Sequence, residues 1–418
     1  MPKTIYLILT FFIGLHFFVQ NRVANAASVA PSKSSFSFTY KNVLEIKTGA
    51  ENFDAYKSLL KSKRVGIVTN QTGIVTIDTK PKQKILEKEQ ISIVDYFLEN
   101  KIKVRKIFAP EHGFRGTADA GEIIKDGIDS KTKLPIVSLY GNNKKPKSTQ
   151  LKGIDIMVFD LQDVGARFYT YISSLHYLME ACAENKIPLI ILDRPNPNIT
   201  IIDGPILETE FTSFVGMHPI PLLHGMTIGE YAKMINGEKW LKNGIQCNIT
   251  VVECVNYNRN RDYSLPVKPS PNLPNDQAIN LYASLCLFEG TNVSVGRGTE
   301  KQFQVYGSPF LPDIFGFNFV PVPNFGAKEP LYKDEKCFGE DLSNTIKVNK
   351  LDLKWLINAY NITSDKKTFF NTFFTKLAGT KKLQQQIESG MSEFEIQNSW
   401  QIGVEKFKEM RSKYLIYK

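Results

Sequence analysis

Carboxylate side chains that follow predicted strands are the first candidates for chemistry in this sequence. Glu111 lies in the tight loop Pro110-Glu111-His112-Gly113, close to phenylalanines on both sides. Burial against aromatic rings would raise the pKa of this carboxyl group, as a general acid requires, although a glutamate here could instead cap the next turn. Asp160 and Asp163 lie three residues apart where another strand ends. They could supply a second carboxylate or orient a ligand, but aspartate is also a common turn former.

Three arginines are candidates for holding an anionic group, because a guanidinium can bind a carboxylate through two parallel hydrogen bonds. They are Arg115, Arg167 and Arg297. Arg297 is the most persuasive of the three, since glycines on both sides allow a ligand to approach the backbone closely.

Aromatic and histidine side chains near the same loops allow two interpretations each. Phe168, Tyr169 and Tyr171 could form a platform against a sugar ring, or the first core turn of the helix that follows. His224 could contact a ligand or be a hydrogen-bonded structural histidine.

A metal site is the main rival chemistry, with mixed nitrogen and oxygen ligands. Its candidate ligands are Glu111, His112, Asp160, Asp163 and Asp193. The sequence contains no HExxH motif or comparable histidine pair, and only His112 among the histidines lies on these loops. It also lacks a G-x-G-x-x-G fingerprint after a strand, a Walker A motif and a G-x-S-x-G elbow. We therefore expect neither a metal ion nor a cofactor.

The elements that must position these residues alternate between short apolar strands and amphipathic helices. The expected strands are 64–69, 104–109, 135–140, 154–160 and 187–193, with helices at 91–100, 170–185 and 227–240. This alternation predicts an α/β fold with a mostly parallel, Rossmann-like sheet covered on both faces. Ligands bind such sheets at the carboxyl ends of the strands. The polar loops Asn70-Gln71, 110–116, 160–167 and 193–198 should therefore converge at one edge.

A second region is expected after residue 240. It opens with a strand over 248–254 and continues through a proline-rich run, a helix around 276–288 and a closing helix over 399–414. We therefore divide the chain into a catalytic domain at 43–240 and a smaller α+β auxiliary domain at 241–418 that closes the cleft.

The amino terminus carries the features of an export signal. Lys3 precedes a 15-residue apolar run from Ile5 to Val19, and Ala24-Asn25-Ala26 matches the small-x-small cleavage pattern. The run is short for a bilayer span of about 20 residues, although a retained anchor is the alternative. We expect residues 1–26 to be removed, leaving an exported protein, periplasmic or extracellular, with no stable membrane span.

Composition is that of an ordinary globular chain of 418 residues with a formal net charge of +10. No block of basic residues indicates nucleic-acid binding. The five cysteines form no CxxC motif, and their odd number leaves at least one thiol free in an exported protein. Cys182 and Cys286 lie in apolar helical patterns, so we expect them in the core.

Six long motifs together resemble one known family, from about residue 45 to the carboxyl terminus. They span residues 65–73, 108–116, 160–171, 192–197, 269–274 and 288–300. The chain is similar to the NamZ-type (YbbC-like) exo-β-N-acetylmuramidases. This resemblance implies a Rossmann-like domain joined to a smaller domain, and removal of terminal β-1,4-linked N-acetylmuramic acid from the non-reducing ends of peptidoglycan fragments.

The resemblance makes Glu111 the leading catalytic carboxylate, and glycoside hydrolysis usually needs a second one. Asp160, Asp163 or Glu289 could be that partner, or the substrate's acetamido group could itself be the nucleophile. Arg297 or Arg167 would suit the lactyl carboxylate of muramic acid. The substrate-binding candidates are Asn70, Gln71, His112, Arg115, Arg167, Tyr169, Tyr171, His224, Asn272, Arg297 and Glu300. The rival functions are a metal-dependent hydrolase of another envelope substrate and a non-catalytic cell-wall-binding protein.

Overall fold

The computed structural model of the protein describes residues 44–78, 88–111, 113–115 and 126–418. Residues 45–418 form one compact unit. The expected signal peptide lies outside the described residues. Across the ranges that are described, no helix is both long and apolar enough to cross a membrane.

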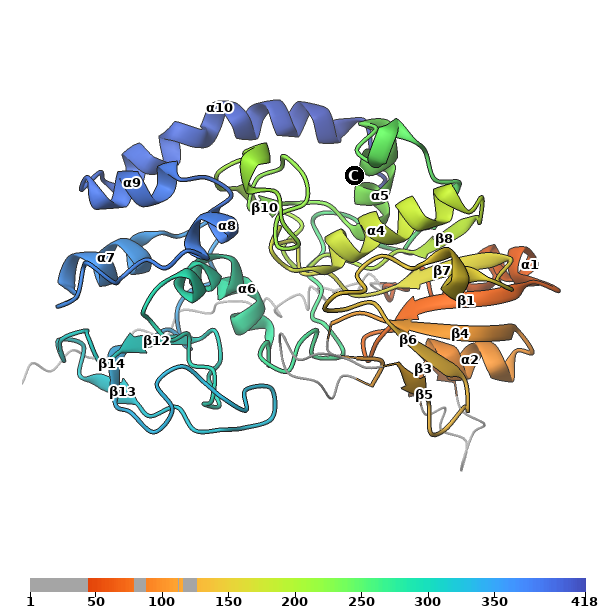
Figure 1. Ribbon diagram of the computed structural model, residues 1–418, viewed down its shortest axis with the longest axis horizontal. Helices are drawn as coiled ribbons and strands as arrows, with labels where there is room; N and C mark the ends of the chain where they lie inside the picture. Colours follow the sequence, from red (N-terminus) through yellow and green to blue (C-terminus); the bar gives the residue numbers. More distant parts are fainter. Residues whose placement is uncertain (1–43, 79–87, 112, 116–125) are drawn as a thin grey trace, which may run out of the picture. The chain divides into compact units, whose positions relative to one another are not determined.

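A seven-stranded sheet forms the amino-terminal region, in the order β11-β8-β7-β1-β4-β6-β5 (Figure 1). All neighbouring strands are parallel except β5, which pairs antiparallel with β6. The strands are β1 Arg64–Thr69, β4 Lys103–Ala109, β5 Gly127–Ile128, β6 Pro135–Ser138, β7 Ile156–Asp160, β8 Leu189–Leu192 and β11 Ile249–Val252. The predicted mostly parallel α/β sheet is therefore confirmed.

Both faces of the sheet are covered, which explains why its strands are continuously apolar. Alternate residues of β7 face opposite sides: Ile156 and Val158 pack into one buried cluster, whereas Met157 and Phe159 pack into the other. The first cluster includes residues of α1 and α2, and the second includes residues of α3, α4 and α5. These helices are α1 Lys57–Leu60, α2 Ile93–Glu99, α3 Ser148–Leu151, α4 Tyr171–Glu184 and α5 Ile228–Gly237.

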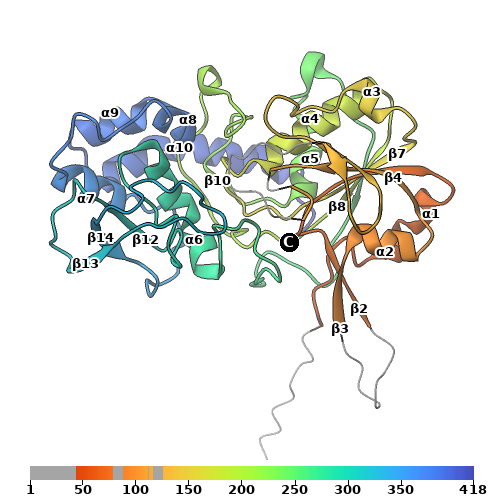
Figure 2. The ribbon, with the colours of Figure 1, turned by 60° about the horizontal axis from the view of Figure 1, so that its bottom comes forward.

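An antiparallel ribbon separates β1 from α2. It consists of β2 (Ile74–Asp78) and β3 (Lys88–Ser92), which Figure 2 shows beside the main sheet. Ser92 ends β3 and caps α2, since its Oγ accepts a hydrogen bond from the amide of Val94 at 3.3 Å. The cap explains why α2 begins slightly later than the helix predicted from residue 91.

The expected domain boundary at residue 240 falls inside the sheet. β11 pairs in parallel with β8, so the strand that was expected to open a second region is the edge strand of the first. Apolar periodicity identified this strand but not its neighbour, because a strand pattern carries no information about which strand it will pair with.

The carboxyl-terminal region combines a small antiparallel sheet, β12-β14-β13, with five helices. Its elements are α6 Asp276–Leu285, β12 Val305–Ser308, β13 Phe317–Phe319, β14 Cys337–Asp341, α7 Lys354–Ile362, α8 Phe374–Ala378, α9 Lys382–Glu388 and α10 Glu393–Ser412. A short pair between the two regions is formed by β9 Ile202–Asp203 and β10 Leu223–His224.

The last residues of the chain return to the amino-terminal sheet. α10 begins with a capping box between Ser392 and Glu395, six residues before the start of the predicted closing helix. Its Trp400 Nε1 donates to Asp203 Oδ1 at 2.8 Å. Beyond it, the Tyr417 hydroxyl donates to Asp193 Oδ2 at 2.8 Å, at the end of β8. The carboxyl-terminal segment therefore helps to close the core of the first region.

All five cysteines are buried, and none of them forms a disulfide bond. Cys182 and Cys286 belong to the larger hydrophobic core, as predicted.

A histidine pair is buried in the same part of the protein: His176 Nδ1 lies 2.9 Å from His218 Nε2, and His218 Nδ1 lies 2.8 Å from the Tyr231 hydroxyl. The His218 ring also stacks on Trp240.

This histidine pair predicts a loss of stability in mild acid. Burial lowers the pKa of His218 well below its ordinary value. Burial also lowers the pKa of His176; the negative charge of Glu180 partly opposes this decrease, and the positive charge of Lys145 adds to it. Below about pH 6.5 the unfolded chain therefore binds protons that the folded chain does not, so stability falls as pH falls. We expect His218 to contribute on the order of 1 kcal/mol between pH 6.5 and 5.5, and His176 to contribute in the same direction. Urea unfolding at both pH values measures the loss.

The control for this prediction is His218→Gln, which keeps a hydrogen-bonding side chain but does not titrate. Its unfolding free energy should change less between pH 6.5 and 5.5 than that of the wild-type protein. Equal changes in the two proteins would show that other groups cause the pH dependence.

Candidate active site

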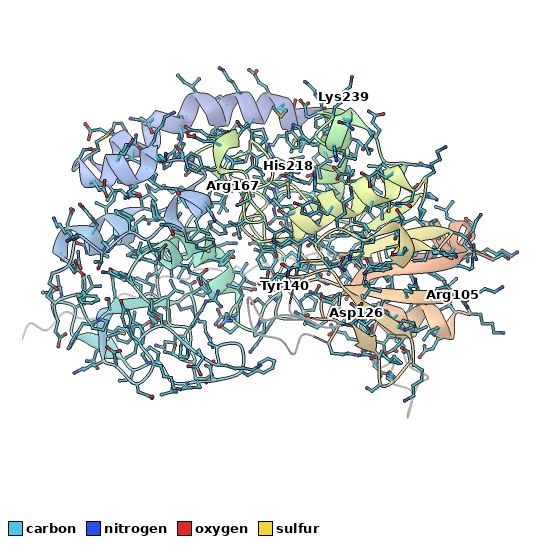
Figure 3. The ribbon with its side chains drawn as sticks, in the orientation of Figure 1. Arg105, Asp126, Tyr140, Arg167, His218 and Lys239 are labelled. Atoms are coloured by element: carbon cyan, nitrogen blue, oxygen red, sulfur yellow. The ribbon has the colours of Figure 1, made fainter. Side chains whose placement is uncertain are left out.

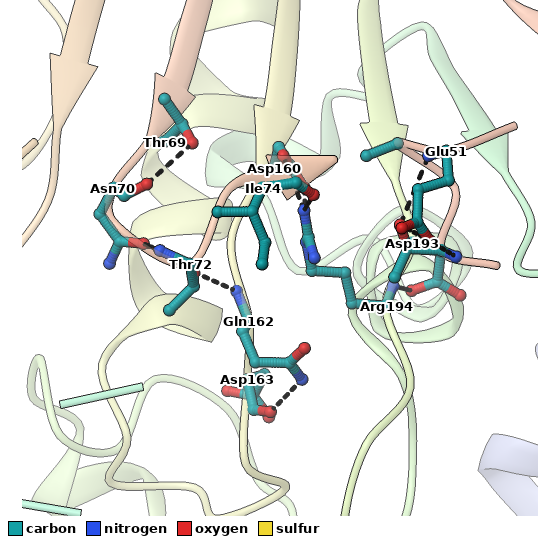
Figure 4. Close-up of polar contacts among 12 residues, drawn as sticks. Glu51, Thr69, Asn70, Thr72, Ile74, Asp160, Gln162, Asp163, Asp193 and Arg194 are labelled. Carbon is teal, nitrogen blue, oxygen red and sulfur yellow. Dashed lines mark hydrogen bonds and ion pairs between the residues drawn. The ribbon is translucent and has the colours of Figure 1, made fainter. Parts of the chain in front are cut away.

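The polar loops do converge at one edge of the sheet. Because β8, β7, β1, β4 and β6 are parallel neighbours, the segments that follow them emerge side by side. Hydrogen bonds connect these segments: the amide of Gln162 donates to Thr72 Oγ1 at 3.1 Å, and Arg194 reaches Asp160 (Figure 4). The predicted convergence of the strand-end loops is thus confirmed.

Glu111 is held by hydroxyl groups from two other loops. The Tyr140 hydroxyl, just after β6, donates to its Oε1 at 3.0 Å, and Thr170 Oγ1, before α4, donates to its Oε2 at 2.8 Å. Burial, together with the negative charge of Glu111, raises the pKa of Tyr140, so this hydroxyl remains a donor. Glu111 is half-buried and each of its two oxygens accepts a hydrogen bond from a different loop, which is the preorganisation expected of a catalytic carboxyl group.

Neither Tyr140 nor Thr170 was among the predicted site residues. Their positions in the sequence made both of them possible candidates, because Tyr140 ends a predicted strand and Thr170 lies within the motif at 160–171. Their contact with Glu111 joins residues 29 and 59 positions apart in the chain, so no local pattern could have revealed it.

Tyr169 and Tyr171 belong to the core and do not form an open platform. Their rings meet edge to face at 4.8 Å, and only 6% and 1% of the two residues is exposed. The Tyr169 hydroxyl donates to the carbonyl of Pro269 at 2.7 Å, and Asn70 Nδ2 donates to the Tyr171 hydroxyl at 2.5 Å. The alternative interpretation, in which these aromatic residues form the first core turn of the helix, is therefore the one that agrees with the structure.

Asp160 has a structural partner. Arg194 Nε and Nη2 donate to its two oxygens at 2.6 and 3.0 Å, and the carboxylate is fully buried. Burial alone would lower the pKa of Arg194, but the Asp160 carboxylate raises it above its ordinary value. Both charges are therefore used within the protein, which argues against a catalytic role for Asp160.

Glu289 is also engaged, by the arginine that was expected to bind substrate. Arg297 Nε donates to Glu289 Oε1 at 2.6 Å, and its guanidinium lies 5.1 Å from the centre of the Phe303 ring. Both side chains keep about a quarter of their surface exposed. The ion pair is neutral overall and lies beside Tyr282, so neither side chain offers an uncompensated charge to a ligand.

Asp163 differs from the other two candidates for the second carboxylate. Its Oδ2 accepts a hydrogen bond from the amide of Gly165 at 2.7 Å and lies 3.5 Å from His224 Nε2. Its Oδ1 is buried and has no hydrogen-bond partner among the residues that the structure describes. Because His224 Nδ1 accepts from the amide of Met226, the proton of the neutral ring lies on Nε2, facing Asp163. Asp163 is therefore an oriented carboxylate with one oxygen still available.

The negative charges of Glu111 and Asp163 both act on the hydroxyl group of Tyr171. The pKa of the buried Tyr171 hydroxyl is raised by burial first, then by the negative charges of Glu111 and Asp163. Of the three candidates for the second carboxylate, Asp163 is the one with an oxygen that has no hydrogen-bond partner among the described residues.

Arg167 and Arg115 both bind other groups of the protein. The Arg167 guanidinium is completely buried and donates to the carbonyl groups of Pro205, Ile220, Leu377 and Ala378. It joins the two regions of the chain, which corrects the expectation that it binds substrate. Arg115 forms a two-pronged ion pair with Asp129 at 2.9–3.1 Å.

The remaining candidates are divided between the cleft loops and the surface. Gln71 Nε2 donates to the carbonyl of Pro269 at 3.3 Å and Asn272 Nδ2 donates to that of Gly326 at 2.7 Å. Both amide oxygens are buried without a partner among the described residues, so each could accept a hydrogen bond from a ligand. Glu300 is exposed, and His112 lies outside the described residues.

A metal site was the rival interpretation of these loops. In the parts of the chain that are described, no group of three or more histidine, cysteine, aspartate or glutamate side chains is arranged to hold a metal ion. Of the five proposed ligands, Asp160 is bound to Arg194, and Asp193 accepts hydrogen bonds from Thr227 and Tyr417.

Two family models match the chain: exo-beta-N-acetylmuramidase NamZ, N-terminal, over residues 65–277, and its C-terminal counterpart over residues 280–417. The chain belongs to the NamZ exo-β-N-acetylmuramidase family. It is accordingly a glycosidase. The boundary between the two family models, at residues 277–280, lies within α6 and after β11. The first model therefore includes β11, which agrees with the position of this strand in the sheet of the first region.

Relatives of the NamZ family match over nearly the whole chain. The peptidoglycan beta-N-acetylmuramidase NamZ of Bacillus subtilis (strain 168) is 40% identical over 439 aligned residues, covering 100% of both proteins. Crystal structures of two DUF1343 family proteins from Bacteroides fragilis NCTC 9343 are also similar. One is 45% identical with a TM-score of 0.80, covering 90% of this chain and 99% of its own. The other is 28% identical with a TM-score of 0.70, covering 89% and 99%.

Proposed function

We propose that this protein releases terminal N-acetylmuramic acid from the non-reducing ends of peptidoglycan fragments by cleaving the β-1,4 linkage. The observation that carries the proposal is the Glu111 carboxyl group, held by Tyr140 and Thr170 at the carboxyl edge of the sheet. The similarity to a peptidoglycan β-N-acetylmuramidase supports the choice of substrate. The apolar run and cleavage pattern at the amino terminus support export to the compartment that contains the polymer.

Glu111 acts as the general acid in this proposal. It protonates the glycosidic oxygen as the bond to the sugar breaks, so that the departing sugar leaves as a neutral alcohol. The hydroxyl groups of Tyr140 and Thr170 fix the direction of the carboxyl group, which limits the reorganisation needed in the transition state.

Asp163 is the second carboxylate. Its free Oδ1 either stabilises the positive charge that develops at the sugar ring or polarises the acetamido group of the substrate. The amide of Gly165 donates to the other oxygen and keeps the carboxylate oriented, with His224 Nε2 3.5 Å away. A water molecule then forms the new bond at the anomeric carbon, and the proton that it loses goes to a carboxylate of the site.

A pair of defined disaccharides tests the proposed reaction. N-acetylmuramic acid β-1,4-linked to N-acetylglucosamine should be cleaved when muramic acid is the non-reducing sugar and should be left intact when the order is reversed. Mass spectrometry of the products measures this end specificity. Cleavage of the reversed disaccharide would contradict the proposed specificity, binding without cleavage would indicate a wall-binding protein, and loss of activity in EDTA would indicate a metal-dependent hydrolase.

The assignment of Asp163 predicts that Asp163→Asn lowers kcat by about 100-fold, because the variant keeps the shape of the side chain but loses its charge. The pH profile of kcat/KM should also lose one limb, which a merely structural role would not cause. Asp155→Asn, which removes a carboxylate from an exposed ion pair with Arg64, is the matched control. A kcat close to that of the wild-type protein would remove Asp163 from the mechanism.

A further inference from the structure

A polar pocket lies beside Tyr140, the residue whose hydroxyl donates to Glu111. It has a volume of about 320 Å³ and opens beside Tyr140, with Asp126, Asn143 and Lys147 among its other lining residues. Tyr140 is shared, because its ring lines the pocket while its hydroxyl donates to Glu111 at 3.0 Å. Figure 3 marks Tyr140 and Asp126, which indicate where this space lies. A ligand in the pocket would therefore be in contact with the residue that orients the proposed general acid.

Several acceptor groups line the pocket. Asn143 Nδ2 donates to the carbonyl of Ser138 at 2.6 Å, which turns its Oδ1 away from that carbonyl. This Oδ1 is buried and has no partner within the described part of the chain. Asp126 Oδ1 accepts from the amide of Ser138 at 2.8 Å. Amide and carboxylate oxygens of this kind suit the hydroxyl groups of a sugar, which need acceptors when they leave water.

Lys147 adds a positive charge to the same wall. Its amide donates to Gln150 Oε1 at 2.8 Å, which fixes the backbone just before α3, and its side chain forms no ion pair with any described residue. The neighbouring lysines are used differently. Lys145 pairs with Glu180 and Glu184 at 2.6 and 2.7 Å, and the Lys144 ammonium lies 4.6 Å from the centre of the Phe214 ring.

The three arginines that were expected to hold a carboxylate all have partners within the protein. Arg297 is paired with Glu289, Arg115 with Asp129, and Arg167 is buried among backbone carbonyl groups. An anionic substrate therefore requires a different cation, and the exposed Lys147 is the lysine among the residues that line the pocket at Tyr140.

We propose that this pocket receives the terminal sugar and that Lys147 binds the lactyl carboxylate of N-acetylmuramic acid. The inference rests on the proposed function, since it assigns the residue that selects the sugar. Asp126 and Asn143 accept hydrogen bonds from the sugar hydroxyl groups, while the ammonium group pairs with the one substituent that distinguishes muramic acid from glucosamine. Lys147 is thus a specificity-determining residue outside the catalytic pair.

A charge-specific comparison tests this proposal. Two chromogenic substrates are used, an N-acetylmuraminide and its lactyl methyl ester, which differ only in the negative charge. The wild-type protein should have a lower KM for the acid, and Lys147→Ala should raise that KM about tenfold or more while leaving the KM for the ester unchanged. Lys147→Arg should restore most of the preference, and kcat should change little in either variant.

Lys144→Ala is the matched control, since it removes a lysine from the same loop but not from the pocket. An unchanged preference for the acid in Lys147→Ala would overturn the proposal, as would an equal loss for the acid and the ester. Failure of the wild-type protein to hydrolyse either muraminide would instead contradict the proposed function, so the two failures are distinguishable.

Discussion

Replacing Glu111 with glutamine is expected to lower kcat on the disaccharide of N-acetylmuramic acid β-1,4-linked to N-acetylglucosamine by about 10²–10⁴-fold, the usual contribution of a general acid. Glutamine has nearly the same shape and can still contact Tyr140 and Thr170, but it has no acidic proton to give to the leaving oxygen. Steady-state kinetics provides the measurement, and KM should change much less than kcat because the lost interaction belongs mainly to the transition state.

The leaving group provides a second readout for Glu111→Gln. A substrate whose leaving group is a good one, such as a nitrophenol, needs little protonation, so it should lose less activity than a natural disaccharide. Glu253→Gln, at an exposed position, is the matched control and should behave as wild type. If Glu111→Gln kept near-wild-type turnover of the disaccharide while remaining folded, Glu111 would not be the general acid.

Asp160→Asn is expected to lower the free energy of unfolding by about 3–5 kcal/mol, because it leaves the Arg194 guanidinium buried without a counter-charge. Both side chains are almost completely buried, and the two hydrogen bonds between them join the ends of β7 and β8. Urea unfolding followed by tryptophan fluorescence measures the change. The kcat of the molecules that remain folded should stay near that of the wild-type protein.

The exposed ion pair between Asp155 and Arg64 is the control for burial. Asp155→Asn should lower the free energy of unfolding far less than Asp160→Asn, because solvent screens the charges of a surface pair. Replacing Asp160 and Arg194 together by Leu and Met should recover much of the stability lost in Asp160→Asn, since no uncompensated charge remains. If Asp160→Asn changed the free energy of unfolding little but lowered kcat strongly, the structural role would be contradicted and Asp160 would again be a candidate for the second catalytic carboxylate.

The two aspartates at the end of β7 illustrate how far sequence reasoning reaches. Asp160 and Asp163 share a loop, a residue type and a position beside the expected cleft, so the sequence could not distinguish them. The structure separates them because Arg194, 34 residues away, reaches Asp160 but not Asp163. The same applies to Arg297, whose partner Glu289 lies on the preceding turn and had been considered as a separate carboxylate.

The sequence by itself determined the parallel strands of the main sheet, the helices α2, α4 and α5 that cover it and the edge where the polar loops meet. It could do so because apolar periodicity and strand direction are local properties that each segment carries in its own residues. Only the tertiary structure decided that β11 joins the first region, that Tyr140 and Thr170 hold Glu111, and that the three candidate arginines are already paired. Those facts depend on which distant side chains share a buried space, because a buried charge or polar group must find a partner there.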